Sequence, residues 1–265
     1  MSDRAPWAHW DLHLSVVIGL ACLGGLYVFL GGRAAPRRRQ VAFAAALAVL
    51  LVALNGPIHD LSDRYLFSVH MAQHLLLTLL FPPLLLAGLT EEIARPLVRP
   101  ALVRAAARLL TRPIPAAALF TAVIGFWHTP VFYEAAMRNH HLHIAQHLVF
   151  LAAAVVMWWP ILSPSPELPR LSYPGQMLYL FFLGLPMSLV GALITLSDRV
   201  LYPFYAEAPR VSGLTPLADQ QLGGLVMWIP GGLVLWLAMT VVWFRWSVRE
   251  DQEEADRAVP LDVYR

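Results

Sequence analysis

The chain of 265 residues is 58% hydrophobic and only 14% charged, with a net charge of +2 and a mean hydropathy of +0.59. Soluble domains carry about 25% charged residues, so this composition excludes a soluble globular protein, and it is too apolar for a disordered chain. All 19 basic residues are arginine, which excludes Schiff-base chemistry on a lysine, and the one cysteine, Cys22, excludes an internal disulfide. The composition therefore indicates an integral membrane protein.

Seven stretches between the charged residues are long and apolar enough to cross a bilayer, which needs about 20 such residues. We therefore expect an all-α fold, a polytopic membrane bundle of seven transmembrane helices. In chain order the expected spans are Leu12–Leu30, Gln40–Ile58, Tyr65–Thr90, Pro113–Tyr133, His141–Leu162, Leu171–Ser197 and Gln220–Phe244.

Arginine is unevenly divided between the loops. The first, third and fifth loops and the C-terminal tail hold 14 arginines, and the N-terminus and the other loops hold 5. Since basic loops stay in the cytoplasm, we expect the N-terminus outside and the C-terminus inside. Residues 1–246 then form one transmembrane domain, and residues 247–265 an acidic, disordered cytoplasmic tail. The long inner loop, residues 91–112, is interpreted as a topology anchor.

An internal repeat organises the polar residues of the predicted spans. His70-Met71-Ala72-Gln73-His74 opens the third span, and His143-Ile144-Ala145-Gln146-His147 opens the fifth span 73 residues later. A weaker third copy, Leu217-Ala218-Asp219-Gln220-Gln221, precedes the seventh span and lacks both histidines. Repeats of this kind are common in membrane bundles built around a shared site. We expect three pseudo-repeated helical hairpins, at about residues 40–90, 113–163 and 171–246.

The spacing of the motif histidines suits a metal ion. Residues i and i+4 share one helix face, so each motif points two imidazoles the same way. A single histidine at a helix end is usually an interfacial residue, but two matched pairs inside a membrane favour ligation. Imidazole suits copper, zinc, iron and nickel, and methionine suits copper(I). The candidate ligands are His70, His74, His143 and His147, with His59, His128, Met71 and Met227 as additional candidates; Gln73, Gln146, Asp219 and Gln220 are candidates for orienting them.

These motifs resemble those of one membrane protein family. Residues 67–74 with Pro82-Pro83, residues 143–147 with Trp159-Pro160, and residues 217–232 are similar to the CtaG-type assembly factors of caa3-type cytochrome c oxidase, over nearly the whole chain. The resemblance implies a multi-pass protein of the bacterial plasma membrane that assists maturation of the oxidase, with copper handling as the suggested chemistry. It also implies oxidase subunits and the lipid bilayer as partners, and no nucleic acid; a homo-oligomer is left open.

Four functions stay open at this point. The first is a non-enzymatic assembly factor that binds copper at the outer face. The second is a haem-binding membrane electron-transfer protein, since histidines from two helices provide bis-imidazole ligation. A metal-dependent hydrolase is disfavoured because the chain lacks His-Glu-x-x-His. A cation transporter is disfavoured because the inner halves of the spans carry few polar residues.

Overall fold

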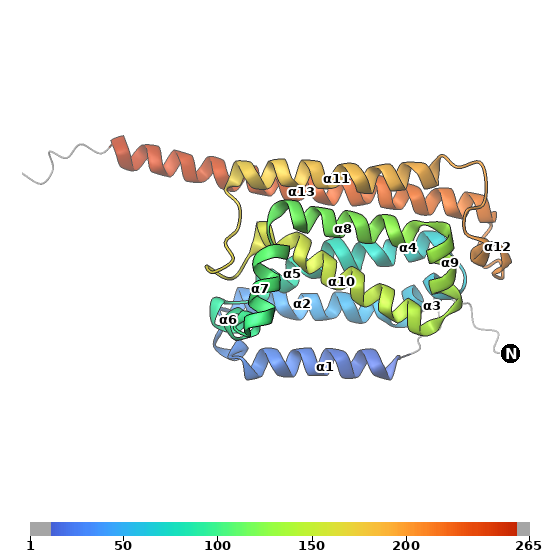
Figure 1. Cartoon of the computed structure of the whole chain (residues 1–265), viewed down its shortest axis with the longest axis horizontal. Coiled ribbons are helices and arrows are strands. Elements are labelled where there is room, and N and C mark those ends of the chain that lie inside the picture. Colours follow the sequence, from blue (N-terminus) through green and yellow to red (C-terminus); the bar gives the residue numbers. More distant parts are fainter. Residues whose placement is uncertain (1–11, 259–265) are drawn as a thin grey trace, which may run out of the picture.

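The computed structural model describes residues 12–258, which form helices joined by short connections, with no strand among them. Most of the helices run along one common direction (Figure 1). In chain order they are α1 (Leu14–Phe29), the 3₁₀ turn η2 (Gly32–Ala34), α2 (Arg37–Leu54), α3 (Gly56–Arg64), α4 (Phe67–Leu75), the π-helical turn η3 (Leu76–Leu80), α5 (Phe81–Gly88), α6 (Glu91–Val98), α7 (Ala101–Leu110), α8 (Pro113–His128), α9 (Pro130–Arg138), α10 (His140–Leu162), α11 (Tyr173–Thr195), α12 (Pro203–Glu207) and α13 (Pro216–Ala258).

Four of these helical segments are long and apolar enough to cross a membrane: residues 67–88, α10, α11 and α13. Two bent pairs raise this number to six, namely α2 with α3 at 43° and α7 with α8 at 86°. The remaining predicted span corresponds to α1, which has 16 residues and is shorter than a full crossing. The all-helical membrane fold is thus confirmed, whereas the number seven and the orientation of the termini stay predictions.

Two predicted spans end earlier than the hydropathy indicates. The second ends at Leu54 and not at Ile58, because Asn55 is extended and Gly56-Pro57 begins the separate helix α3. The fourth ends at His128 and not at Tyr133, because Thr129 is extended, as expected for a residue that precedes a proline. Both breaks turn the chain into the short helices α3 and α9, which carry polar residues close to the ends of the long helices.

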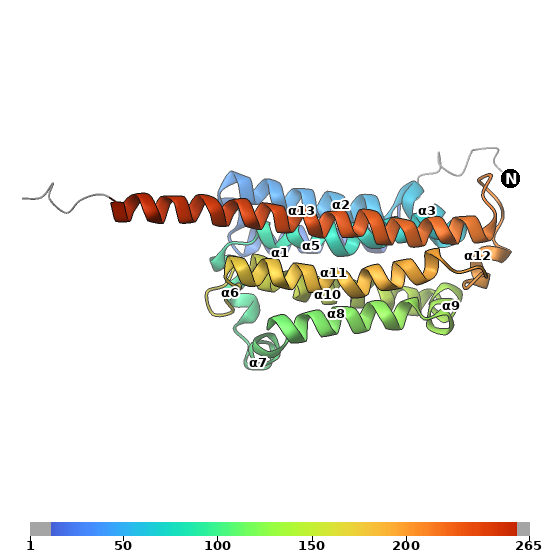
Figure 2. The same cartoon turned by 90° about the horizontal axis from the view of Figure 1, so that it is seen from above.

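The helices of each predicted hairpin pack against each other: α2 against α5, α8 against α10, and α11 against α13 (Figures 1 and 2). The starts of α4, α10 and α13 lie at the same end of the bundle, together with α3, α9 and α12. The arginine-bearing helices α6 and α7 lie at the opposite end. The three motifs are therefore gathered at one end of the molecule.

The third predicted span is irregular where two prolines enter it. Pro82 has no N–H, so the carbonyl of Thr78, four residues earlier, lacks its usual helical partner. The chain forms the π-helical turn η3 before this point, and the indole Nε1 of Trp158 on α10 donates to the Thr78 carbonyl at 3.0 Å. The proline pair thus fixes a hydrogen bond between the helices that carry the two histidine motifs.

The last helix is longer than predicted at both ends, since α13 begins at Pro216 and continues to Ala258. Residues 247–258 were expected to be disordered and are helical instead. Side-chain pairs one turn apart support this extension: Arg249 Nε lies 2.8 Å from Glu253 Oε1, and Trp246 Nε1 donates to Glu250 at 3.0 Å. The predicted tail from residue 259 onward lies outside the described residues.

Candidate metal centre

The two histidine motifs lie on the buried faces of neighbouring helices. His70 and His74 are one turn apart on α4, and His143 and His147 are one turn apart on α10. Each of the four is at least nine-tenths buried. We call these four residues the histidine cluster.

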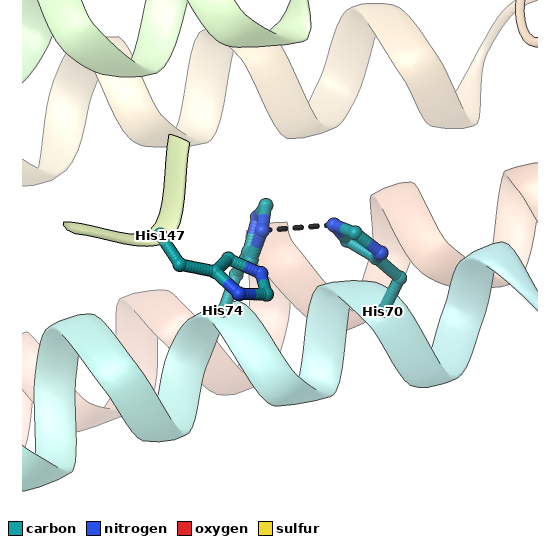
Figure 3. A group of neighbouring side chains, drawn as sticks. All are labelled: His70, His74 and His147. Carbon is teal, nitrogen blue, oxygen red and sulfur yellow. Dashed lines mark hydrogen bonds between the residues drawn. The ribbon is translucent and has the colours of Figure 1, made fainter. Parts of the chain in front are cut away.

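The rings of the histidine cluster are within reach of one another. His70 Nε2 and His74 Nε2 are 2.8 Å apart (Figure 3). The His147 ring centroid lies 5.6 Å from that of His74 and 6.0 Å from that of His70, and His143 stacks on His70 at 5.4 Å. One nitrogen from each of His70, His74 and His147 falls within a set spanning no more than 4.8 Å. This spacing is compatible with a shared ion, since metal–imidazole bonds are about 2 Å long.

A phenol beside the cluster determines how His70 presents its nitrogens. The Tyr205 hydroxyl donates to the Ser62 carbonyl at 2.6 Å and lies 3.1 Å from His70 Nδ1. Burial raises the pKa of Tyr205 well above its ordinary range, so the phenol keeps its proton. With that proton directed to Ser62, His70 Nδ1–H donates to the phenol oxygen, and His70 Nε2 offers its lone pair toward His74. Ligating histidines in proteins are oriented by this kind of outer hydrogen bond.

A carboxylate lies next to the cluster at the end of the bundle. Asp63 Oδ2 on α3 is 3.6 Å from His143 Nδ1 and 3.5 Å from His59 Nε2. Asp63, His70 and His143 form a second set with ligand atoms within 4.8 Å of one another. Sequence reasoning missed Asp63 and Tyr205 as site residues. The i, i+4 spacing of His59 and Asp63 was a usable signal for Asp63. Tyr205 lies on the short helix α12 between α11 and α13, and no local sequence pattern indicates it.

The additional candidate ligands fall in two different places. His59 lies at the outer edge, where it contacts Asp63 and the ring of His13, and it is not part of either set of grouped ligand atoms. His128 on α8 lies next to His74, and the centroids of the two rings are 5.8 Å apart. Met71 and Met227 line a small cavity beside His74 and His128.

Several buried nitrogens of these histidines have no hydrogen-bond partner within residues 12–258. They are His74 Nδ1, His128 Nε2, His143 Nε2 and His147 Nε2. Burying a polar nitrogen without a partner is costly, and most such groups in folded proteins are satisfied. Four partnerless imidazole nitrogens gathered in one region fit a transition metal ion, which neutral imidazoles bind through their lone pairs.

The candidate orienting residues act on the site in different ways. Gln73 donates to the Ala53 carbonyl at 2.8 Å and so holds the end of α2. Its other partner is His59, and it makes no hydrogen bond to the four cluster histidines. Both polar atoms of the buried Gln146 lack a partner among the described residues. Gln220 accepts from the Leu201 N–H at 2.6 Å and donates to the Arg199 carbonyl, and thereby fixes the loop that leads to Tyr205.

Asp219, from the third motif, holds the start of the helix that carries the first motif. Its fully buried carboxylate accepts from the backbone N–H groups of Phe67 and Ser68 at 2.8 and 3.2 Å, and from the Ser68 hydroxyl at 2.5 Å. These are free N–H groups of the first turn of α4, where a negative charge is also favourable to the helix dipole. The third motif therefore contributes a capping carboxylate where the other two contribute imidazoles.

Three uncharacterized mycobacterial proteins are similar to this chain. Mb0105 of Mycobacterium bovis and MT0111 of Mycobacterium tuberculosis are each 29% identical over 247 residues, which is 85% of this chain and 36% of theirs. ML1998 of Mycobacterium leprae is 24% identical over 265 residues, covering 92% of this chain and 39% of its own. The chain thus spans less than half the length of these relatives. No solved structure matches it.

A family model also matches most of the chain, and this match includes every motif described above. It covers residues 24–249 and is described as cytochrome c oxidase caa3 assembly factor. Helices α4 and α10 and the motif residues of α13 lie inside this range, so the geometry of the site belongs to the part of the chain that the family shares. The chain is a member of the cytochrome c oxidase caa3 assembly factor family.

Proposed function

We propose that this assembly factor binds copper in the histidine cluster and makes it available while a metal centre of the oxidase is completed. The observation that carries the proposal is the convergence of four buried imidazoles, from two helices, with partnerless nitrogens on three of them. Imidazole nitrogen is a ligand that copper binds well. Copper is the cargo here, so the proposed role is delivery and not catalysis.

The surroundings of the cluster support reversible binding of a cation. Asp63 places a carboxylate beside His143, which compensates positive charge at the entrance. The Tyr205 and Ser62 contacts hold His70 in one orientation, so part of the ordering cost is met before the ion arrives. His59 at the outer edge is placed to take part in entry or release.

The packing favours a single ion over haem. The cavity beside His74 and His128 has a volume of about 20 Å³, enough for one water-sized guest. A porphyrin would require α4, α8 and α10 to separate. The haem-binding electron carrier is therefore the weaker alternative.

The proposed setting is the bacterial plasma membrane, with the N-terminus and the histidine cluster toward the outer face and α6 and α7 toward the cytoplasm. The arginine-bearing ends of α6 and α7 lie opposite the cluster, in line with the arginine count of the loops. The oxidase subunit that receives copper would then dock at the end of the bundle formed by α3, α9 and α12.

Copper content tests the proposal. The full chain, purified with and without copper in the growth medium, is compared with His74→Ala/His147→Ala and with the control His140→Ala/His141→Ala, whose side chains are exposed at the start of the same helix α10. We expect copper in the wild type and the control, and its loss in the cluster variant. Equal copper in all three proteins would refute the ligand assignment, and a Soret band in the wild type would favour haem. In cells, the cluster variant should yield oxidase with less copper.

A further inference from the structure

A second set of metal-binding groups lies one helical turn deeper than His70. The small cavity beside His74 is lined by His74, His128, Met71, Met187 and Met227, together with apolar side chains and Thr78. These five residues come from α4, α8, α11 and α13. We call this space the methionine cavity.

Each of the two lining histidines has one ring nitrogen that carries a lone pair and has no partner among the described residues. His128 Nδ1 donates to the Ile124 carbonyl at 2.8 Å, so the proton resides on Nδ1 and the partnerless Nε2 carries a lone pair. In the network described above His74 Nε2–H donates to His70, which leaves a lone pair on the partnerless His74 Nδ1. Both histidines are more than nine-tenths buried. A histidine whose other ring nitrogen donates to a backbone carbonyl is the usual form of a metal ligand.

The remaining polar lining does not satisfy these nitrogens. The Thr78 hydroxyl already donates to the His74 carbonyl at 2.7 Å. The three thioether sulfurs have no hydrogen to donate. A water molecule would satisfy the two nitrogens and leave the sulfurs as poor partners, whereas copper(I) accepts both imidazole and thioether ligands.

We infer that the methionine cavity is a separate site for a soft monovalent metal ion, copper(I), held by His74 Nδ1, His128 Nε2 and thioether sulfur. The cavity volume of about 20 Å³ fits one ion, and the 5.8 Å between the ring centroids is compatible with two metal–nitrogen bonds of about 2 Å. A neutral His74 has one lone pair, so it ligates through Nδ1 in this cavity while Nε2–H faces His70, or through Nε2 in the histidine cluster after its proton moves to Nδ1. The second site extends the proposed copper function, and its assignment to copper depends on that function.

X-ray absorption at the copper edge tests this inference on the full chain, loaded anaerobically with copper(I). We expect sulfur neighbours at about 2.3 Å in the wild type, the length of a metal–sulfur bond. Met71→Leu/Met187→Leu/Met227→Leu should lose this signal and about one equivalent of copper. Met137→Leu/Met157→Leu changes two buried methionines outside the cavity and should keep both. Each exchange of methionine for leucine nearly conserves side-chain volume, so we expect the variants to fold. If the triple variant does not fold, the single variants Met187→Leu and Met227→Leu replace it, and each should show fewer sulfur neighbours of copper than the wild type.

The outcomes separate this site from the histidine cluster. His143→Ala/His147→Ala leaves every lining residue of the cavity unchanged, so it should keep the sulfur neighbours even though it loses copper from the cluster. Wild-type protein with only nitrogen or oxygen neighbours, or with a sulfur signal that survives all the methionine exchanges, would refute the second site. Copper in the histidine cluster would stand in either case.

Discussion

Replacing Asp219 tests the most specific contact between the third motif and the first. Asp219→Ala leaves the backbone N–H groups of Phe67 and Ser68 buried without an acceptor, together with the Ser68 hydroxyl. Loss of a helix cap costs about 0.5–2 kcal/mol, and each buried donor left without a partner costs about 1–3 kcal/mol. With partial relaxation we expect Asp219→Ala to lower the free energy of unfolding by roughly 2–5 kcal/mol.

The conservative variant separates charge from hydrogen bonding. Asp219→Asn keeps one acceptor oxygen and removes the negative charge at the start of α4, an interaction worth up to about 2 kcal/mol when partly buried. It should therefore lie between the wild type and Asp219→Ala. Asp198→Ala is the matched control, because its side chain is 93% exposed in the loop that follows α11.

The assay is equilibrium unfolding of detergent-solubilised protein, followed by far-ultraviolet circular dichroism, together with copper binding. Because Asp219 sets the position of α4, we expect copper affinity to fall in the same order as stability. The reasoning would be refuted if Asp219→Ala unfolded within about 0.5 kcal/mol of the control, the range usual for surface substitutions.

Three further predictions concern the contacts around the site and between the helices. Tyr205→Phe should weaken copper binding about 10–100-fold, because it removes the hydroxyl that orients the His70 imidazole. The control Tyr179→Phe loses a buried 2.8 Å hydrogen bond to a carbonyl of α10, so it should lower stability and leave copper affinity unchanged. Asp63→Asn should likewise lower copper affinity about 10–100-fold with little change in unfolding; unchanged affinity would remove the carboxylate from the site. Gly224→Ala should destabilise the protein by about 1–3 kcal/mol in thermal unfolding, because the new Cβ would lie 2.7 Å from a backbone nitrogen of α11. The control Gly232→Ala, on the same helix, places its Cβ in open space and should not destabilise the protein.

Hydropathy and proline positions predicted most of the helices of this protein. Long apolar segments have no stable alternative to helix in a bilayer, since every backbone N–H and C=O needs a partner within the chain. The same measure cannot detect where a span stops when the following residues stay moderately apolar. The break at Thr129 depends on backbone conformation before Pro130, and the break at Asn55 on the positive φ of Gly56, and hydropathy detects neither.

The proximity of the four motif histidines was predicted from spacing and repetition: i and i+4 residues share one face of a helix, and hairpins related by rotation about the bundle axis turn both faces toward the centre. The hydrogen-bond partners that orient these histidines were not predicted. Tyr205 belongs to a five-residue helix whose position depends on contacts with α9 and α13, so no local pattern indicates it. Gln146 occupies the same motif position as Gln73, yet within residues 12–258 only Gln73 has a hydrogen-bond partner, so equal motif positions have different surroundings.

The divergence of the third motif has a physical explanation in these contacts. The histidine positions of the third motif are taken by Leu217 and Gln221, both half-buried. Asp219 lies between them, at the position of Ala72 and Ala145, and its carboxylate accepts from two free N–H groups at the start of α4, the helix on which His70 and His74 lie. A metal site assembled from separate helices is only as precise as the placement of those helices. Two copies of the repeat thus supply the proposed ligands, and the third holds the start of α4, one of the two helices that carry them.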